Sequence, residues 1–133
     1  MIVVDAGTLI ALWNRDDAHH DLARSVFTAR DSALMHPVTL GEALVYAVAQ
    51  QHEARARAQL ELLGIRTAAQ APDEAFLLAR ARAATGLRMP DCCALVTAEH
   101  LGLPLMTTDR RLAEVARSRG VAVPHGPGRA ARP

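Results

Sequence analysis

The chain has 133 residues, half of them apolar, and so has the size of one compact domain with its own core. Its 15 basic residues, all arginines, stand against 14 acidic ones for a net charge of +1, and aromatic residues make up only 3%. This composition excludes a strongly basic nucleic-acid coat protein and a platform for stacked bases, so on composition alone RNA and DNA are not expected partners.

Short apolar segments alternate with longer ones whose apolar residues recur at helical spacing. Residues 2–4 form a β-branched run too short for a helix, and Ala6 and Gly7 are predicted to form a turn after it. The patterns predict further strands over 33–36, 65–67, 103–107 and 121–123. They predict helices from a cap at Asp16 or Asp17 to Phe27, from a cap at Thr39 onward, over 53–63, from Pro72 to about Gly86, over 91–100 and over 109–119.

Strands that alternate with helices predict an α/β fold with three layers, α/β/α, around a central and mainly parallel sheet. We place this domain at residues 1–123 and expect residues 124–133, rich in Gly, Pro, Ala and Arg, to be a mobile tail.

The helix face with Val45 and Val48 and the side chain of Trp13 are expected in the core. Cys92 and Cys93 are adjacent and are not expected to form a disulfide. No export signal is apparent, and no apolar run is long enough to cross a membrane. These features favour a location in the cytoplasm.

Four acidic residues follow predicted strands or begin predicted helices, where the chemistry of open α/β sheets gathers: Asp5, Glu42, Asp91 and Asp109. Asp91 and Asp109 also have structural explanations, because a carboxylate is favourable at a helix N-terminus and can cap it. Asp5 and Glu42 are flanked by apolar residues, and the chain has no lysine to pair with them. A metal ion bound by several carboxylates would compensate these charges, and oxygen ligands favour Mg²⁺ or Mn²⁺ over zinc.

Four segments of the chain resemble the PIN domain: residues 4–12 (VDAGTLIAL), 37–42 (PVTLGE), 89–95 (MPDCCAL) and 105–109 (LMTTD). Their order and intervals are similar to those of the small bacterial VapC-type toxins of toxin–antitoxin pairs, over residues 1 to about 123. The resemblance implies a metal-dependent endoribonuclease whose catalytic residues hold one or two Mg²⁺ or Mn²⁺ ions. These residues would be Asp5 and Asp91, as the most direct ligands, with Glu42 and Asp109, and Thr107 would support the site.

The resemblance also implies a biological role and partners. Such a toxin hydrolyses phosphodiester bonds of tRNA, rRNA or mRNA and so inhibits translation and growth. A cognate VapB-type antitoxin, a homodimer and a toxin–antitoxin hetero-oligomer are expected. Arg88 and Arg110 lie near two of the carboxylates in the sequence and are candidates for contacts with substrate phosphates.

The chain departs from the family just after the first aspartate, where many relatives have a Ser or Thr and then another small polar residue. Ala6 and Gly7 stand here, so a hydroxyl contact to a carboxylate or a metal-bound water is missing unless Thr8 supplies it, although the Thr8 side chain is expected to point elsewhere. Two alternative functions fit the sequence less well. A phosphatase of the haloacid-dehalogenase type needs a second Asp where the chain has Gly7. A PIN-like module that binds RNA or protein without cleavage predicts a lost carboxylate, whereas all four are present.

Overall fold

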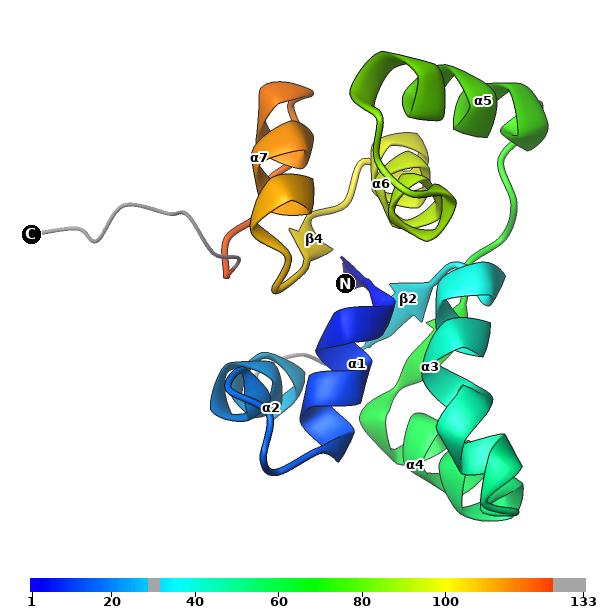
Figure 1. Ribbon diagram of the computed structural model, residues 1–133, viewed down its shortest axis with the longest axis vertical. Helices are drawn as coiled ribbons and strands as arrows, with labels where there is room; N and C mark the ends of the chain where they lie inside the picture. Colours follow the sequence, from blue (N-terminus) through cyan, green and yellow to red (C-terminus); the bar gives the residue numbers. More distant parts are fainter. Residues whose placement is uncertain (29–31, 126–133) are drawn as a thin grey trace, which may run out of the picture.

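The computed structural model describes residues 1–28 and 32–125, which form four strands and seven helices (Figure 1). In chain order these are β1 (Ile2–Val4), α1 (Ala6–Trp13), α2 (His20–Thr28), β2 (Ala33–Met35), α3 (Pro37–Ala49), α4 (Glu53–Leu63), β3 (Ile65–Thr67), α5 (Glu74–Thr85), α6 (Met89–Leu101), β4 (Leu105–Met106) and α7 (Arg110–Ser118). The strands form one parallel sheet in the order β3-β2-β1-β4, in which Val3 is paired with Leu34 on one side and with Leu105 on the other.

Alternate side chains of the sheet enter two separate hydrophobic clusters. Val3 and Leu105 belong to the cluster with α5, α6 and α7, whereas Val4 and Met106 belong to the cluster with α1, α2 and α3. Successive side chains of a strand point to opposite faces of a sheet, so the sheet is covered on both faces. In Figure 1 these two groups of helices lie on opposite sides of the strands. The predicted three-layer α/β/α fold with a parallel sheet is confirmed.

The segment after β1 differs from its prediction. The turn predicted at Ala6 and Gly7 is wrong, because α1 begins at Ala6 directly. Asp5 has an extended backbone and its side chain accepts a hydrogen bond from the Thr8 backbone N–H, as a helix N-cap does. A cap at the last position before the helix allows the strand to pass into the helix without an intervening turn.

The last predicted strand, over 121–123, is also wrong. The Leu105 N–H donates to the Ala122 carbonyl (2.9 Å), but the segment is irregular in the structure. The strand predicted over 103–107 is shortened to β4, since Pro104 has no N–H for a sheet ladder. Apart from Pro124 and His125, the predicted tail over 124–133 lies outside the described residues.

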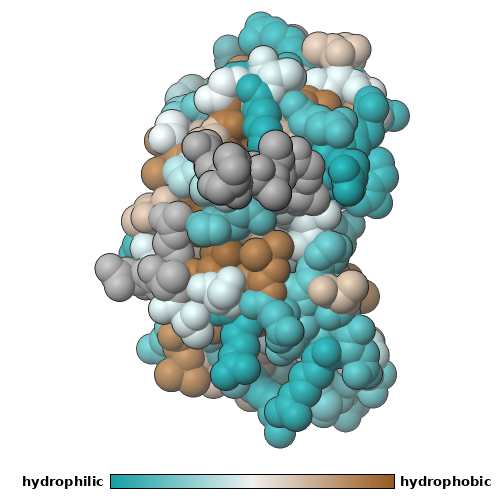
Figure 2. All heavy atoms as spheres, turned by 90° about the vertical axis from the view of Figure 1, so that its left-hand side faces the viewer, coloured by the Kyte–Doolittle hydropathy of each residue, from teal (hydrophilic) through white to brown (hydrophobic). Residues whose placement is uncertain are grey.

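Helix α3 presents apolar side chains to solvent. Val45 and Val48, expected in the core, are 65% and 50% exposed, whereas Trp13, also expected there, is half-buried and packs against the edge of the second cluster. The helix turns Thr39 and Ala43 inward, and its opposite face has no cover from the described part of the chain. The side of the molecule with α2 and α7 is mainly hydrophilic, with apolar side chains exposed in several places (Figure 2). No helix within residues 1–28 and 32–125 combines the length and apolar character of a membrane span.

Both cysteines are buried in α6 and are free thiols, in agreement with the sequence. Burial raises the pKa of the Cys93 thiol to about 11, so this group stays protonated at neutral pH. The two thiols therefore act as small apolar side chains, and a chemical role has to come from other residues.

Candidate active site

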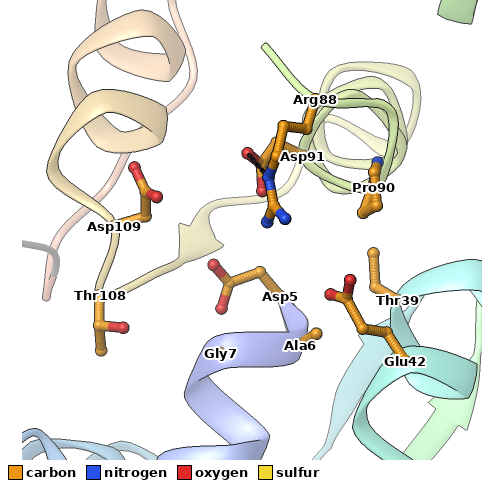
Figure 3. A pocket seen from close by; sticks show the side chains of 10 residues that line it. All are labelled: Asp5, Ala6, Gly7, Thr39, Glu42, Arg88, Pro90, Asp91, Thr108 and Asp109. Carbon is orange, nitrogen blue, oxygen red and sulfur yellow. Dashed lines mark ion pairs between the residues drawn. The ribbon is translucent and has the colours of Figure 1, made fainter.

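One pocket of about 300 Å³ opens at the carboxyl edge of the sheet (Figure 3). Asp5 directly follows β1, and Asp109 follows β4 after two threonines. Glu42 is on α3, the helix after β2, and Asp91 is in the first turn of α6. The structure thus brings together the four carboxylates that the sequence singles out. The pocket is lined by Asp5, Ala6, Gly7, Thr39, Glu42, Arg88, Pro90, Asp91, Thr108 and Asp109.

Asp5 is buried at the base of this pocket, with 6% of its surface exposed. Burial raises the pKa of its carboxyl above the usual 3.8, while hydrogen bonds from Thr107 and Thr8 act in the opposite direction. Within the described residues no basic side chain forms an ion pair with Asp5. A buried carboxylate without a cationic partner is costly in its ionised form, which makes this position a candidate for a cation ligand.

The Thr8 hydroxyl contacts Asp5, contrary to the prediction that it points elsewhere. Its Oγ1 donates to Asp5 Oδ1 at 2.7 Å, and its backbone N–H donates to the same oxygen at 3.0 Å. The prediction failed because it placed a turn after Asp5. A helix that begins at Ala6 puts Thr8 in its first turn, facing the cap. Thr8 therefore supplies a hydroxyl in place of the one that Ala6 lacks.

Asp91 lies opposite Asp5 and is partly buried. Burial raises the pKa of its carboxyl, and Arg88, whose Nε lies 3.7 Å from Asp91 Oδ2, opposes this rise. The negative charges of Asp109, Asp5 and Glu42 raise the same pKa further. The Asp91 carboxylate is therefore repelled by all three other acids of the pocket. A cation bound among the four carboxylates would offset this repulsion.

Glu42 and Asp109 are the exposed members of the group. Glu42 has apolar neighbours in the sequence, but adjacent side chains on a helix point about 100° apart, and its own side chain faces the pocket (Figure 3). Asp109 caps α7, since its Oδ1 accepts from the Leu112 N–H at 2.8 Å. The structural explanation of Asp109 therefore holds, and it leaves the second carboxylate oxygen available to the pocket.

Thr107 connects two of the acids. It is fully buried, and its hydroxyl donates a hydrogen bond to Asp5 Oδ2. The oxygen of this hydroxyl, Thr107 Oγ1, accepts a hydrogen bond from the backbone N–H of Asp109 at 3.0 Å. The hydroxyl thus fixes the Asp5 carboxylate relative to the start of α7. The threonine two residues before Asp109 therefore has a structural role, because it contacts the carboxylate of one acid and the backbone of the other.

The two arginines predicted to bind substrate occupy different places. Arg88 lines the pocket with a side chain that is 71% exposed. Arg110 is the first residue of α7, exposed and next to Asp109, but it is not among the residues that line the pocket. Thr39 also lines the pocket, although the sequence offers it only as a helix cap.

The donor chemistry of the pocket fits a hard divalent cation. All four acidic groups offer carboxylate oxygens, and the buried one has no basic partner in the described chain. As the side chains stand in residues 1–28 and 32–125, no three His, Cys, Asp or Glu residues are grouped to hold an ion. Because Glu42 is exposed, its side chain has room to change rotamer around an ion, whereas Asp109 is held by its cap contact with Leu112.

A pH-dependent stability difference is expected in metal-free buffer. The pKa of Asp5 is raised on folding, so between its unfolded and folded values the folded state binds more protons, and stability falls as the pH rises through this range. Asp5→Asn removes this loss. The melting temperature of Asp5→Asn minus that of the wild type should therefore increase from about pH 4 toward about pH 7. Thermal scans in EDTA measure it, and a difference independent of pH would contradict a raised pKa at Asp5.

The fold and the pocket define an α/β domain with an acidic site at the carboxyl edge of a parallel sheet. A model of the PIN domain family matches residues 2–118, and the chain belongs to that family. The resemblance to the PIN domain found in the sequence is confirmed. A comparison with curated proteins found no match.

Three solved structures show the same fold. A toxin–antitoxin complex from Klebsiella pneumoniae has a TM-score of 0.72 at 22% identity and covers 95% of both chains. VapC20 from Mycobacterium tuberculosis, a sarcin–ricin loop cleaving toxin, has a TM-score of 0.66 at 19% identity over 86% of this chain and 95% of its own. PAE2754 from Pyrobaculum aerophilum has a TM-score of 0.56 at 27% identity over 85% of this chain and 82% of its own.

Proposed function

We propose that the protein is a divalent-metal-dependent endoribonuclease that acts in the cytoplasm as the toxin of a toxin–antitoxin pair. The observation that carries the proposal is the convergence of four carboxylates from separate elements on one pocket, around a buried Asp5 without a basic partner in the described chain. Membership of the PIN domain family supports it. So do the solved relatives, which include a toxin–antitoxin complex and a sarcin–ricin loop cleaving toxin.

In this proposal Asp5 and Asp91 are the most direct ligands of one or two Mg²⁺ or Mn²⁺ ions, and Glu42 and Asp109 complete the site from the pocket walls. A bound divalent ion supplies a Lewis acid for the phosphoryl oxygens and lowers the pKa of a coordinated water. The chain supplies the negative charge that attracts the ion, and the charges of Asp109, Asp5 and Glu42 raise the pKa of Asp91. Thr8 and Thr107 donate hydrogen bonds to the two Asp5 oxygens and orient them.

Arg88 is the residue best placed to contact the substrate. Its side chain is mostly exposed and lines the pocket. Its ion pair with Asp91 is long, with 3.7 Å between Arg88 Nε and Asp91 Oδ2. Such a pair contributes little and can give way to a phosphate, which a guanidinium binds with two parallel hydrogen bonds. Arg110 is proposed as a more distant contact. Attack of water on phosphorus with departure of the 3′ oxygen, which takes a proton, gives a 5′-phosphate and a 3′-hydroxyl.

Two apolar surfaces are proposed for the protein partners. A groove of about 700 Å³ between α3, α4 and β3 has an apolar floor and carries Glu53, Arg57 and Arg66 among its lining residues. We assign this groove to a VapB-type antitoxin. The exposed Val38, Val45 and Tyr46 of α3 are assigned to a homodimer contact. The apolar residues that line the antitoxin groove are Leu40, Leu44, Val48, Ala56, Leu60 and Ile65.

Removal of divalent metal tests the proposed function. The purified protein should cleave RNA in Mg²⁺ or Mn²⁺ and stop in EDTA, and Mn²⁺ should raise the melting temperature of the metal-free protein because the ion binds only the folded state. Gel analysis of labelled RNA and thermal scans measure both effects. Cleavage that persists in EDTA would contradict metal dependence. Binding of RNA without cleavage in either metal would favour the alternative, a PIN-like module that only binds.

A further inference from the structure

His36 connects the first turn of α3 to the start of α5 through its two ring nitrogens. It is 3% exposed and lies between β2 and α3. Its Nδ1 lies 3.0 Å from the backbone N of Val38, and its Nε2 lies 3.2 Å from Glu74 Oε1 on α5. A backbone amide can only donate, so Nδ1 is the acceptor of that bond and the ring proton of the neutral histidine is on Nε2, directed at the Glu74 carboxylate.

The same residue holds the first turn of α3. The sequence predicts a cap at Thr39, but the N-cap is His36, whose side chain accepts from Val38. The His36 carbonyl accepts both the Thr39 hydroxyl and the Leu40 N–H, each at 2.9 Å. Thr39 lines the pocket, and Glu42 follows within one turn. The position of the Glu42 carboxylate therefore depends on how this turn is held.

Glu74 connects this turn to α5, which does not itself line the pocket. It is the first residue of α5, its side chain is 12% exposed, and it follows Asp73, which has a left-handed backbone (φ 58°) and provides no side-chain cap. Helix α5 packs against α6, the helix that carries Asp91. The His36–Glu74 bond thus ties the helix of Glu42 to the pair of helices that places Asp91.

We propose that His36 is a positioning residue which, through Glu74, sets the separation of Glu42 and Asp91 and thereby the affinity of the pocket for a divalent cation. The inference rests on the proposed function, because it takes the pocket to be a cation site. It differs from a purely structural role, which would stabilise the fold and leave the affinity of the folded protein unchanged.

The chain offers a matched control for His36. His52 is also a histidine at a helix N-cap, but it forms no side-chain cap bond, is exposed, and begins α4, which contributes no residue to the acidic pocket. His52→Ala therefore removes the same side chain at the same helix position, from a residue that makes no cap contact. At Glu74, Glu74→Gln keeps an oxygen that accepts from His36 Nε2, whereas Glu74→Ala removes the acceptor.

Titration calorimetry with Mn²⁺ alone, on the folded full-length variants, tests the proposal. His36→Ala and Glu74→Ala should weaken Mn²⁺ binding by roughly 10-fold, as loss of a supporting hydrogen bond does at metal sites. Glu74→Gln and His52→Ala should bind as the wild type does. Amide exchange of Thr39 to Ala43 should be faster in His36→Ala than in His52→Ala. If His36→Ala does not fold, the Glu74→Ala and Glu74→Gln pair decides the question.

Three outcomes would overturn the proposal: wild-type affinity in folded Glu74→Ala, equal weakening by Glu74→Gln and Glu74→Ala, or a wild type that binds no Mn²⁺. A lower melting temperature in Glu74→Ala without weaker Mn²⁺ binding would assign His36 and Glu74 to the fold alone. A wild type that binds Mn²⁺ but does not cleave RNA contradicts the proposed nuclease, and the affinities of the variants then still decide the role of His36.

Discussion

Asp5→Asn is expected to abolish RNA cleavage while the metal-free protein stays folded and becomes no less stable. Asparagine has nearly the same shape as aspartate but cannot bring a negative charge to the base of the pocket. Loss of a direct metal ligand removes several kcal/mol of transition-state stabilisation, so kcat/KM should fall by at least about 100-fold. The increase in melting temperature that Mn²⁺ produces in the wild type should be lost as well.

The stability of this variant follows from the surroundings of Asp5. Burial raises the pKa of the wild-type carboxyl, so the ionised form opposes folding at neutral pH, and asparagine removes that charge. The Thr8 N–H can still donate to the remaining oxygen, and the Thr107 hydroxyl can rotate to accept from the new amide. Activity and stability are therefore expected to move in different directions, as is common when a buried charged group of an active site is replaced.

Asp21→Asn is the matched control for this experiment. Asp21 is exposed in the first turn of α2 and does not line the pocket, so its replacement should leave cleavage within about twofold of the wild type. Kinetics on labelled RNA and thermal scans with and without Mn²⁺ give the comparison. If Asp5→Asn kept its cleavage rate, Asp5 would not be a metal ligand.

The sequence was informative where each residue responds to its immediate neighbours. Residues 2–4 are apolar at every position because β1 is buried on both faces, and this pattern is visible without any structure. Asp5, Asp91 and Asp109 follow strands or begin helices, so an α/β topology alone is enough to predict that they meet. For the same reason the fold class, the sheet and the acidic pocket could be predicted.

Two of the errors concern features that depend on distant parts of the chain, and one concerns a local helix boundary. Whether Val45 faces the core depends on which elements cover α3, and no described element covers that face. The contact between Thr8 and Asp5 depends on the residue at which α1 begins, and sequence boundaries are imprecise by more than that. His36 and Glu74 are 38 residues apart, and no local pattern indicates that they pair.

The net charge of +1 also requires a new interpretation. It suggested that the chain has no nucleic-acid partner, but it averages an acidic pocket with arginines distributed over the chain. The four carboxylates form a local negative charge that would repel RNA in the absence of a cation. For this site the arrangement of the charges is informative, and their sum is not.

Thr107→Val is expected to have the second largest effect, because it removes one hydroxyl that orients two acids. Valine retains the branched shape of threonine but cannot donate to Asp5 Oδ2 or accept from the Asp109 N–H. Loss of such a supporting contact at a metal site lowers activity by about 10- to 100-fold. Thr97→Val is the control, since the Thr97 hydroxyl is also buried and donates to the Cys93 carbonyl (2.7 Å), away from the pocket.

The pH dependence of Thr107→Val separates an effect on Asp5 from a general loss of stability. The Thr107 hydrogen bond is the largest contribution that lowers the pKa of Asp5, so its removal should raise that pKa further and move the ionisation of the carboxyl to higher pH. The activity profile of the variant should therefore move to higher pH, and part of the lost rate should return as the pH rises. Thr97→Val should lose stability and keep the wild-type profile. A rate reduced by the same factor at every pH in Thr107→Val would show that the hydroxyl supports only the fold and does not hold the Asp5 carboxylate in its ionised form.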